Sequence, residues 1–451
     1  MTYAPPGPDL TALRAKIATA SPAVAWKSIR ELVRSRGLGE LVLAGEFAEA
    51  AAVPSEKLLK LWTKAPDPDR FAEFLLAPAF VREGRDELEL RGRTSLAGVR
   101  HLTVLRRLRL VGCKNLTGLS ELASLTGLEE LGMEGAASVT DLTPLAGLTS
   151  LKSLNLRSCR GVTSVSALLG LRELRHLDLQ SSGVRDLTGI GEALPSLRRL
   201  ELANCRFLED VTPLAGLREL TQLDLSRTKI RSLAGLRDLD SVRELSLHCA
   251  RLTSLDGVDS MPSLERLWLS GATHLTSLDG LGHHPRLTVL GLPQAALPDL
   301  RPLKRLPALT DLSINEYNKL TTLDGLEGHP SLAELGLIYA TDMTDFSVLA
   351  AMPALRELTL QGLDQLADLS AFAGLRDLEC LTLAYLDDLR SLASLTDLPS
   401  LRELNLYDCP ELVDLGAVPG FPALEEVEID GCDALPSATL EDLRARGLLK
   451  D

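Results

Sequence analysis

Three carboxylates recur at one register of the sequence and are the residues best placed to do chemistry. They are Asp178, Glu201 and Asp224, each 23 residues from the next. If each lies on its own strand of a parallel sheet, neighbouring carboxylates stand about 5 Å apart and repel one another. A structural network neutralised by Arg157 and Arg199 ranks first, and a basic side chain of a partner second. A metal ion or enzymatic acid–base chemistry ranks last.

Large side chains near the strand ends form a second candidate set. Strand alternation turns Trp268 and Ile338 toward solvent, and the tyrosines at 317, 339, 385 and 407 follow the last leucines of their repeats. Exposed aromatic side chains that a core does not need are typical of binding surfaces. We therefore predict a partner-binding surface, with Tyr317 assigned to packing between repeats. Its residues are Trp268, Ile338, Tyr339, Tyr385 and Tyr407, together with Asp178, Glu201 and Asp224.

Common catalytic motifs are missing from the sequence. It has no G-x-x-x-x-G-K-[ST], H-E-x-x-H or G-x-S-x-G segment and no C-x-x-C pair. His284-Pro285 and His329-Pro330 take equivalent places in two repeats and are interpreted as repeat features, not as ligands. We expect that the protein is not an enzyme and that it binds no cofactor and no metal. The alternatives are an enzyme or a small-ligand or metal binder at the three carboxylates, and a sensor arm that works with a separate NTPase switch.

Both candidate sets are positioned by a repeat that fills most of the chain. The pattern L-x-x-L-x-L appears at Leu151, Leu154 and Leu156 and recurs every 22 or 23 residues. Its end alternates with period two, which predicts a strand with leucines on one side that only stacked repeats can bury. The last apolar positions are 110, 133, 156, 179, 202, 225, 247, 269, 292, 314, 337, 360, 383, 406 and 429, with a weaker copy at Leu90.

This triplet and its period resemble the leucine-rich repeat proteins over roughly residues 85–435. The resemblance implies an α/β solenoid, a horseshoe with a parallel concave sheet of about 15–16 strands. Segments such as 141–150 have room only for a short turn or 3₁₀ piece, which is similar to the bacterial internalin-like class. In that family the place three residues after the last leucine is an inward ladder position. Five cysteines occupy it here, and we expect free structural thiols at 113, 159, 205, 409 and 432.

The chain ends differ from the repeats. Ser21-Pro22 and Asp67-Pro68 are helix starts, and seven of the sixteen aromatic residues fall within residues 1–84. We predict an N-terminal all-α cap domain (1–84), the repeats (85–435) and a C-terminal cap helix (436–451). Caps are expected because the end repeats of a solenoid would otherwise expose their leucines.

Charge and hydropathy limit the classes of partner. The net charge of −14 argues against nucleic-acid binding. With no apolar run of about 18 residues and no signal-like start, we expect a cytoplasmic protein without membrane contact. Arginine outnumbers lysine 37 to 11, which is typical of a GC-rich bacterial genome. The predicted function is a monomeric, non-enzymatic scaffold that binds a protein partner on the concave face.

Overall fold

The computed structural model describes residues 10–35, 37–249, 251–315, 320–363, 366–372 and 374–450, so Tyr317 lies outside the described residues. The chain divides into two compact units, Met1–Leu197 and Arg198–Asp451. Each unit is described by itself.

Helices fill the beginning of the first unit, which we call the helical region. They are α1 (Leu10–Arg14), α2 (Pro22–Arg34), α3 (Leu38–Ala50), α4 (Ser55–Trp62), α5 (Pro68–Phe71) and α6 (Ala77–Glu83), with a π-helical turn at Ala72–Leu76. Ser21 caps α2 by accepting a hydrogen bond from the Val24 amide, and Asp67 caps α5 by accepting from Arg70. The core includes Ile29, Phe47, Trp62, Phe71 and Phe80. The predicted N-terminal helical region is confirmed.

Sixteen strands occur among the described residues, and their paired neighbours run parallel in chain order. The first unit holds β1 (Glu87–Arg91), β2 (Arg107–Val111), β3 (Glu130–Gly132), β4 (Ser153–Asn155) and β5 (His176–Asp178). The second unit holds β6 (Arg199–Glu201), β7 (Gln222–Asp224), β8 (Glu244–Ser246), β9 (Arg266–Trp268), β10 (Val289–Gly291), β11 (Asp311–Asn315), β12 (Glu334–Ile338), β13 (Glu357–Gln361), β14 (Cys380–Ala384), β15 (Glu403–Tyr407) and β16 (Glu426–Asp430). The predicted leucine-rich repeat solenoid with a parallel sheet is confirmed.

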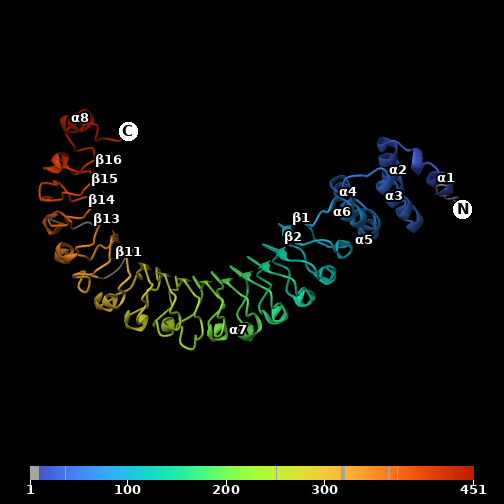
Figure 1. Cartoon of the computed structure of the whole chain (residues 1–451), viewed down its shortest axis with the longest axis horizontal. Coiled ribbons are helices and arrows are strands. Elements are labelled where there is room, and N and C mark those ends of the chain that lie inside the picture. The colour runs from blue at the N-terminus through green and yellow to red at the C-terminus, as the bar shows by residue number, and fades with distance from the viewer. Residues whose placement is uncertain are drawn as a thin grey trace. The chain divides into compact units, whose positions relative to one another are not determined.

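Connections between strands are short. Within each unit the strands line the inner side of the curve and the turns lie outside (Figure 1). Most turns are 3₁₀ segments such as Thr143–Leu145 and Thr212–Leu214, and one is a short helix, α7 (Ile190–Ala193). In the second unit α8 (Ser437–Ala445) follows β16 and buries Leu443 completely, while Leu440 is half-buried. The strand residues that point away from the leucine core therefore face solvent on the inner side of the curve. We call this face the outward side of the sheet.

All seven cysteines are free, and all except the half-buried Cys380 are buried. The Cys159 thiol donates to the Met133 carbonyl at 3.2 Å, and the Cys249 thiol donates to the Leu225 carbonyl at 2.9 Å. Burial raises the pKa of Cys159 to about 11, so its thiol stays protonated near neutral pH. These contacts place the sulfurs as hydrogen-bonding core groups between repeats.

Thiol titration of the denatured, unreduced protein is expected to find seven free thiols. Cys409 and Cys432 are the pair best placed to join, because the two thiols are hydrogen-bonded to each other, a contact that lowers the pKa of Cys432. They follow the adjacent strands β15 and β16 at equivalent positions, a spacing that suits a bridge. A count of five would mean that this pair has oxidised. A count of three or fewer would contradict the account of the cysteines as structural thiols.

Two buried histidines occupy a core position that other repeats fill with Met261 or Leu306. His284 is completely buried and His329 is 4% exposed. Burial lowers the pKa of both rings, although carbonyls of the preceding turns and, for His284, Asp259 oppose the shift. Both side chains are therefore neutral parts of the core.

Stability is expected to fall as the pH drops below about 6.5, the ordinary histidine pKa. Below this pH the two histidines bind protons in the unfolded chain but not in the folded chain. The free energy of unfolding therefore falls by at most about 1.4 kcal/mol per histidine per pH unit. Urea unfolding at pH 7.5 and pH 5.5 measures this loss. The variant H284M/H329M should lose less stability over the same interval, and an equal loss in both proteins would contradict the assignment.

Candidate partner-binding face

Two of the three predicted carboxylates cap the ends of their own strands. The Asp178 carboxylate accepts a hydrogen bond from the Gln180 amide at 2.9 Å, and Asp224 accepts from the Ser226 amide at 2.9 Å. Asn155 makes the same bond to the Arg157 amide. Asp178, in the first unit, is only 5% exposed. Its oxygens are used locally, and little of its surface is left for a partner.

Glu201 is held by its neighbour on the same strand. Its carboxylate lies 2.6 Å from Arg199 Nε, which is the neutralisation that the sequence suggested, whereas Arg157 hydrogen-bonds to Gln180 instead. The hollow beside Glu201 and Asp224 has a volume of about 170 Å³. Small-molecule sites usually measure about 300–1,000 Å³. Among the described residues no group of three or more His, Cys, Asp or Glu side chains could hold a metal ion.

The predicted aromatic and apolar residues all lie in the second unit. Tyr339 and Tyr385, directly after β12 and β14, are 37% and 45% exposed. Ile338 and Tyr407 end β12 and β15 and are half-buried. The structure brings these four residues together within four consecutive strands, β12 to β15. Trp268 ends β9, three strands before β12, so it stands apart from this group.

Both exposed tyrosines occupy a backbone position that suits glycine. Two places after the last leucine, most repeats hold a residue with φ between +47° and +80°. This position is filled by Gly92, Gly112, Gly135, Ser158, Ser181, Asn204, Arg227, Gly271, Tyr339, Gly362, Tyr385, Asp408 and Gly431. For a residue with a Cβ this left-handed conformation costs about 1–2 kcal/mol. Tyrosine is therefore an unfavourable choice for the fold at these two places.

The rings of Tyr339 and Trp268 extend toward the following repeat, and each lies over a glycine. A Cβ on Gly362 would come within 2.2 Å of the Tyr339 ring, and a Cβ on Gly291 within 2.8 Å of the Trp268 ring. Gln361 Nε2 donates to the Tyr339 hydroxyl at 3.3 Å. The charge of Asp408 and a hydrogen bond to it raise the pKa of Tyr385. These contacts hold the rings of Trp268, Tyr339 and Tyr385 near the ends of their strands. Glycine 23 residues after each of Trp268 and Tyr339 was the sequence signal for this packing.

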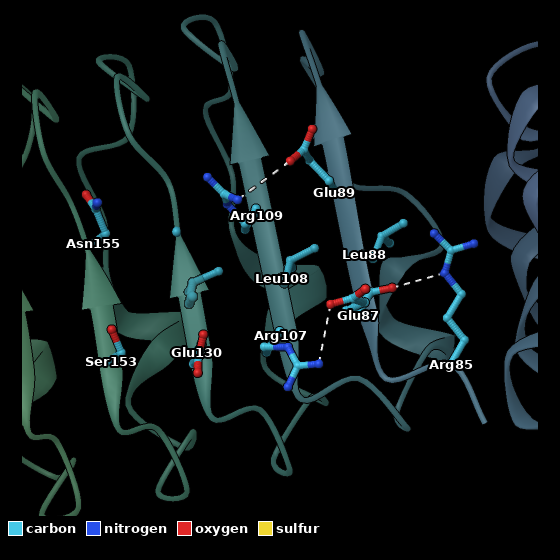
Figure 2. A pocket seen from close by; sticks show the side chains of 12 residues that line it. Arg85, Glu87, Leu88, Glu89, Arg107, Leu108, Arg109, Glu130, Ser153 and Asn155 are labelled. Atoms are coloured by element: carbon cyan, nitrogen blue, oxygen red, sulfur yellow. Dashed lines mark hydrogen bonds and ion pairs between the residues drawn. The ribbon is translucent and has the colours of Figure 1, made fainter.

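A groove in the first unit was not predicted. It has a volume of about 500 Å³ and opens on the outward side of β1 to β4, beside Gly132, which has no side chain to fill it. Figure 2 shows Arg107 turned toward Glu87 and Arg109 toward Glu89. The N–O distances of these two ion pairs are 3.3 and 4.0 Å. Its arginines and glutamates are equal in number, so the lining is close to neutral. The lining residues are Arg85, Glu87, Leu88, Glu89, Arg107, Leu108, Arg109, Glu130, Leu131, Gly132, Ser153 and Asn155.

A family model described as a leucine-rich repeat region matches residues 90–392, more than half of the chain. Similar folds occur in a leucine-rich repeat protein of Leptospira interrogans, with 19% identity, a TM-score of 0.53 and coverage of 81% of this chain and 100% of that one. The functional domain of InlJ from Listeria monocytogenes, which includes a cysteine ladder, has 18% identity, a TM-score of 0.50 and coverage of 81% and 79%.

Internalin InlF of Listeria monocytogenes has 20% identity, a TM-score of 0.49 and coverage of 83% and 93%. No curated protein matches the sequence. Among the described residues no helix is long and apolar enough to cross a membrane. The family match covers most of the repeats, and the chain therefore belongs to the leucine-rich repeat family.

Proposed function

We propose that this protein is a non-enzymatic recognition module that binds a protein partner on the outward side of the sheet in the second unit. The observation that carries the proposal is the pair of exposed tyrosines, Tyr339 and Tyr385, at backbone positions where the fold favours glycine. Strained residues of this kind cluster at functional sites, and exposed tyrosines are frequent binding hot spots. Leucine-rich repeats commonly mediate protein–protein interaction, which agrees with this assignment.

Ile338 and Tyr407 extend the proposed surface along β12 to β15, and Trp268 adds a separate contact on β9. Glu201 and Asp224 contribute at the rim, where charges act mainly on the association rate. We do not include Asp178 because it is buried. The small hollow beside Glu201 gives less support to an enzyme or small-ligand site than the tyrosines give to a protein-binding one.

Three further parts of the proposal concern the setting of the protein. Free, buried thiols suit a reducing compartment, so we place the protein in the cytoplasm. We also expect it to be a monomer. We assign the helical region as the cap of the first repeats and α8 as the cap of the last. We expect no nucleic-acid partner because of the net charge of −14.

Affinity capture from a lysate of the native organism tests the proposal against its alternative. The immobilised full chain should retain a specific protein that 1 M NaCl weakens only in part, because ring burial is little screened by salt. In parallel, metal analysis and a thermal-shift screen with small metabolites should show no bound metal and no stabilisation. A tight metal or metabolite ligand without a captured protein would overturn the proposal.

A further inference from the structure

The outward side of β11 to β16, which we call the acidic face, carries charge of one sign. Its positions are the first, third and fifth residues of each of these six strands. Seven of them are carboxylates and none is lysine or arginine. The seven are Asp311, Glu334, Glu357, Glu403, Glu426, Glu428 and Asp430. Outward positions elsewhere are mixed, with arginines on β1, β2, β6 and β9.

Neighbouring carboxylates on the acidic face are in direct register. Asp311 pairs with Glu334 and Glu334 with Glu357, on strands about 4.8 Å apart. Burial raises the pKa of Glu357, and the charges of Glu334 and Glu403 raise it further. Like charges this close favour the arrival of cations.

Compensation from within the chain reaches only one end of the acidic face. Lys450 Nζ lies 2.7 Å from Glu426 and 3.6 Å from Glu428. Across the described part of the chain, no other lysine or arginine lies within 4 Å of the seven carboxylates. Five of them are therefore available to cationic groups of a partner.

The acidic face also has an apolar row, on the opposite side from most of the carboxylates. Ile338 and Tyr407 are the fifth residues of their strands, and Tyr339 and Tyr385 follow at the same edge. Five carboxylates stand at the first residues of their strands, about 13 Å away along the strand direction at 3.3 Å per residue. A partner segment that fits this pattern carries a cationic row and an apolar row side by side.

We propose that the acidic face docks a basic amphipathic segment of the partner protein, with arginine or lysine against the Asp311–Glu403 row and apolar side chains against the tyrosines. This inference rests on the proposed function and specifies the chemistry of the partner. The argument for this occupant is charge complementarity, since the acidic face holds seven carboxylates against the single nearby Lys450. Such an interface should weaken with rising ionic strength.

A fluorescein-labelled twelve-residue peptide of alternating arginine and leucine tests this inference by fluorescence anisotropy with the full chain. The variant E334Q/E357Q/E403Q removes three charges with little change of shape and should weaken binding about tenfold or more. The matched control E49Q/E56Q/E73Q removes three exposed charges from the helical region and should bind like the original protein. A peptide of alternating glutamate and leucine should not bind.

Three results would overturn the inference: equal weakening in both triple variants, no weakening in either, or comparable binding of the glutamate peptide. Capture from lysate separates this failure from failure of the proposed function. If the partner is captured equally by E334Q/E357Q/E403Q but not by Y339G/Y385G, the basic segment is wrong and the recognition face stands. If Y339G/Y385G still captures the partner, the recognition face is wrong.

Discussion

The double variant Y339G/Y385G is expected to lose capture of the partner while keeping its fold. An aromatic ring at the centre of an interface is worth roughly 2 kcal/mol or more, which is about a 30-fold change in affinity for each ring. Glycine relieves the left-handed backbone at both positions, with φ of +53° and +52°, and this offsets the lost ring contacts. The melting temperature should therefore change little, as measured by circular dichroism.

Phe207 provides the matched control for this experiment. It is 60% exposed in the same unit, away from β12 to β15, with Lys229 stacked on its ring at 5.7 Å. Its replacement by alanine removes an exposed ring of similar size and should leave capture unchanged. An equal loss of partner capture in F207A would mean that capture reflects nonspecific hydrophobic binding. Unfolding of Y339G/Y385G would mean that the tyrosines belong to the core.

The second large effect is expected at Gly98, where the helical region contacts the first repeats. Gly98 has φ +91°, and a Cβ there would lie 2.6 Å from the Pro68 carbonyl oxygen and 2.7 Å from the Ala72 side chain. Asp69 contacts Arg100 at 2.5 Å and His101 at 3.1 Å across the same junction. The variant G98A should separate these segments and uncover the apolar end of the repeats.

Gly135 separates backbone strain from loss of this contact. It also has a positive φ, +74°, but a Cβ there meets no atom within 4 Å. G98A should therefore cost about 1–3 kcal/mol more than G135A in urea unfolding, which is the usual penalty of an overpacked contact. It should also speed hydrogen exchange in β1. Equal stability of the two variants would contradict the assignment of the helical region as a cap.

The repeat and its ends could be predicted from the sequence because their signals are local and redundant. Strand alternation and the fixed period recur in repeat after repeat, so the pattern can be recognised even where single residues depart from it. Ser21 and Asp67 likewise act on amides three residues away, and both caps form as the sequence indicated. These two helix caps were therefore predictable from the sequence.

The three carboxylates show where prediction from the sequence reaches its limit. Their spacing correctly gave the register of Glu201 with Asp224 on β6 and β7, but it could not reveal that Asp178 and Asp224 accept hydrogen bonds from amides two residues ahead. The neighbouring charge of Arg199 was visible, and its pairing with Glu201 followed. Whether a carboxylate is free depends on backbone geometry at the strand end, which the period alone does not encode.

The acidic face was missed for a related reason. Five of its seven carboxylates begin their strands, whereas the candidate residues chosen from the sequence lie beside or after the last leucine of each repeat. Glu334, Glu357 and Glu403 become one surface only when the register of β12, β13 and β15 is known. The groove beside Gly132 likewise depends on side chains from four strands.

Site-specific photo-crosslinking tests the central proposal, partner binding on the outward side of the sheet, most directly. A benzophenone amino acid at Gln361, on β13, samples the face between the two tyrosines. The same group at Ala350, exposed on the outer turn Ser347–Ala351, samples the opposite side of the preceding connection. The proposal predicts a crosslinked partner from position 361 and none from position 350. A partner crosslinked only from position 350 would contradict it.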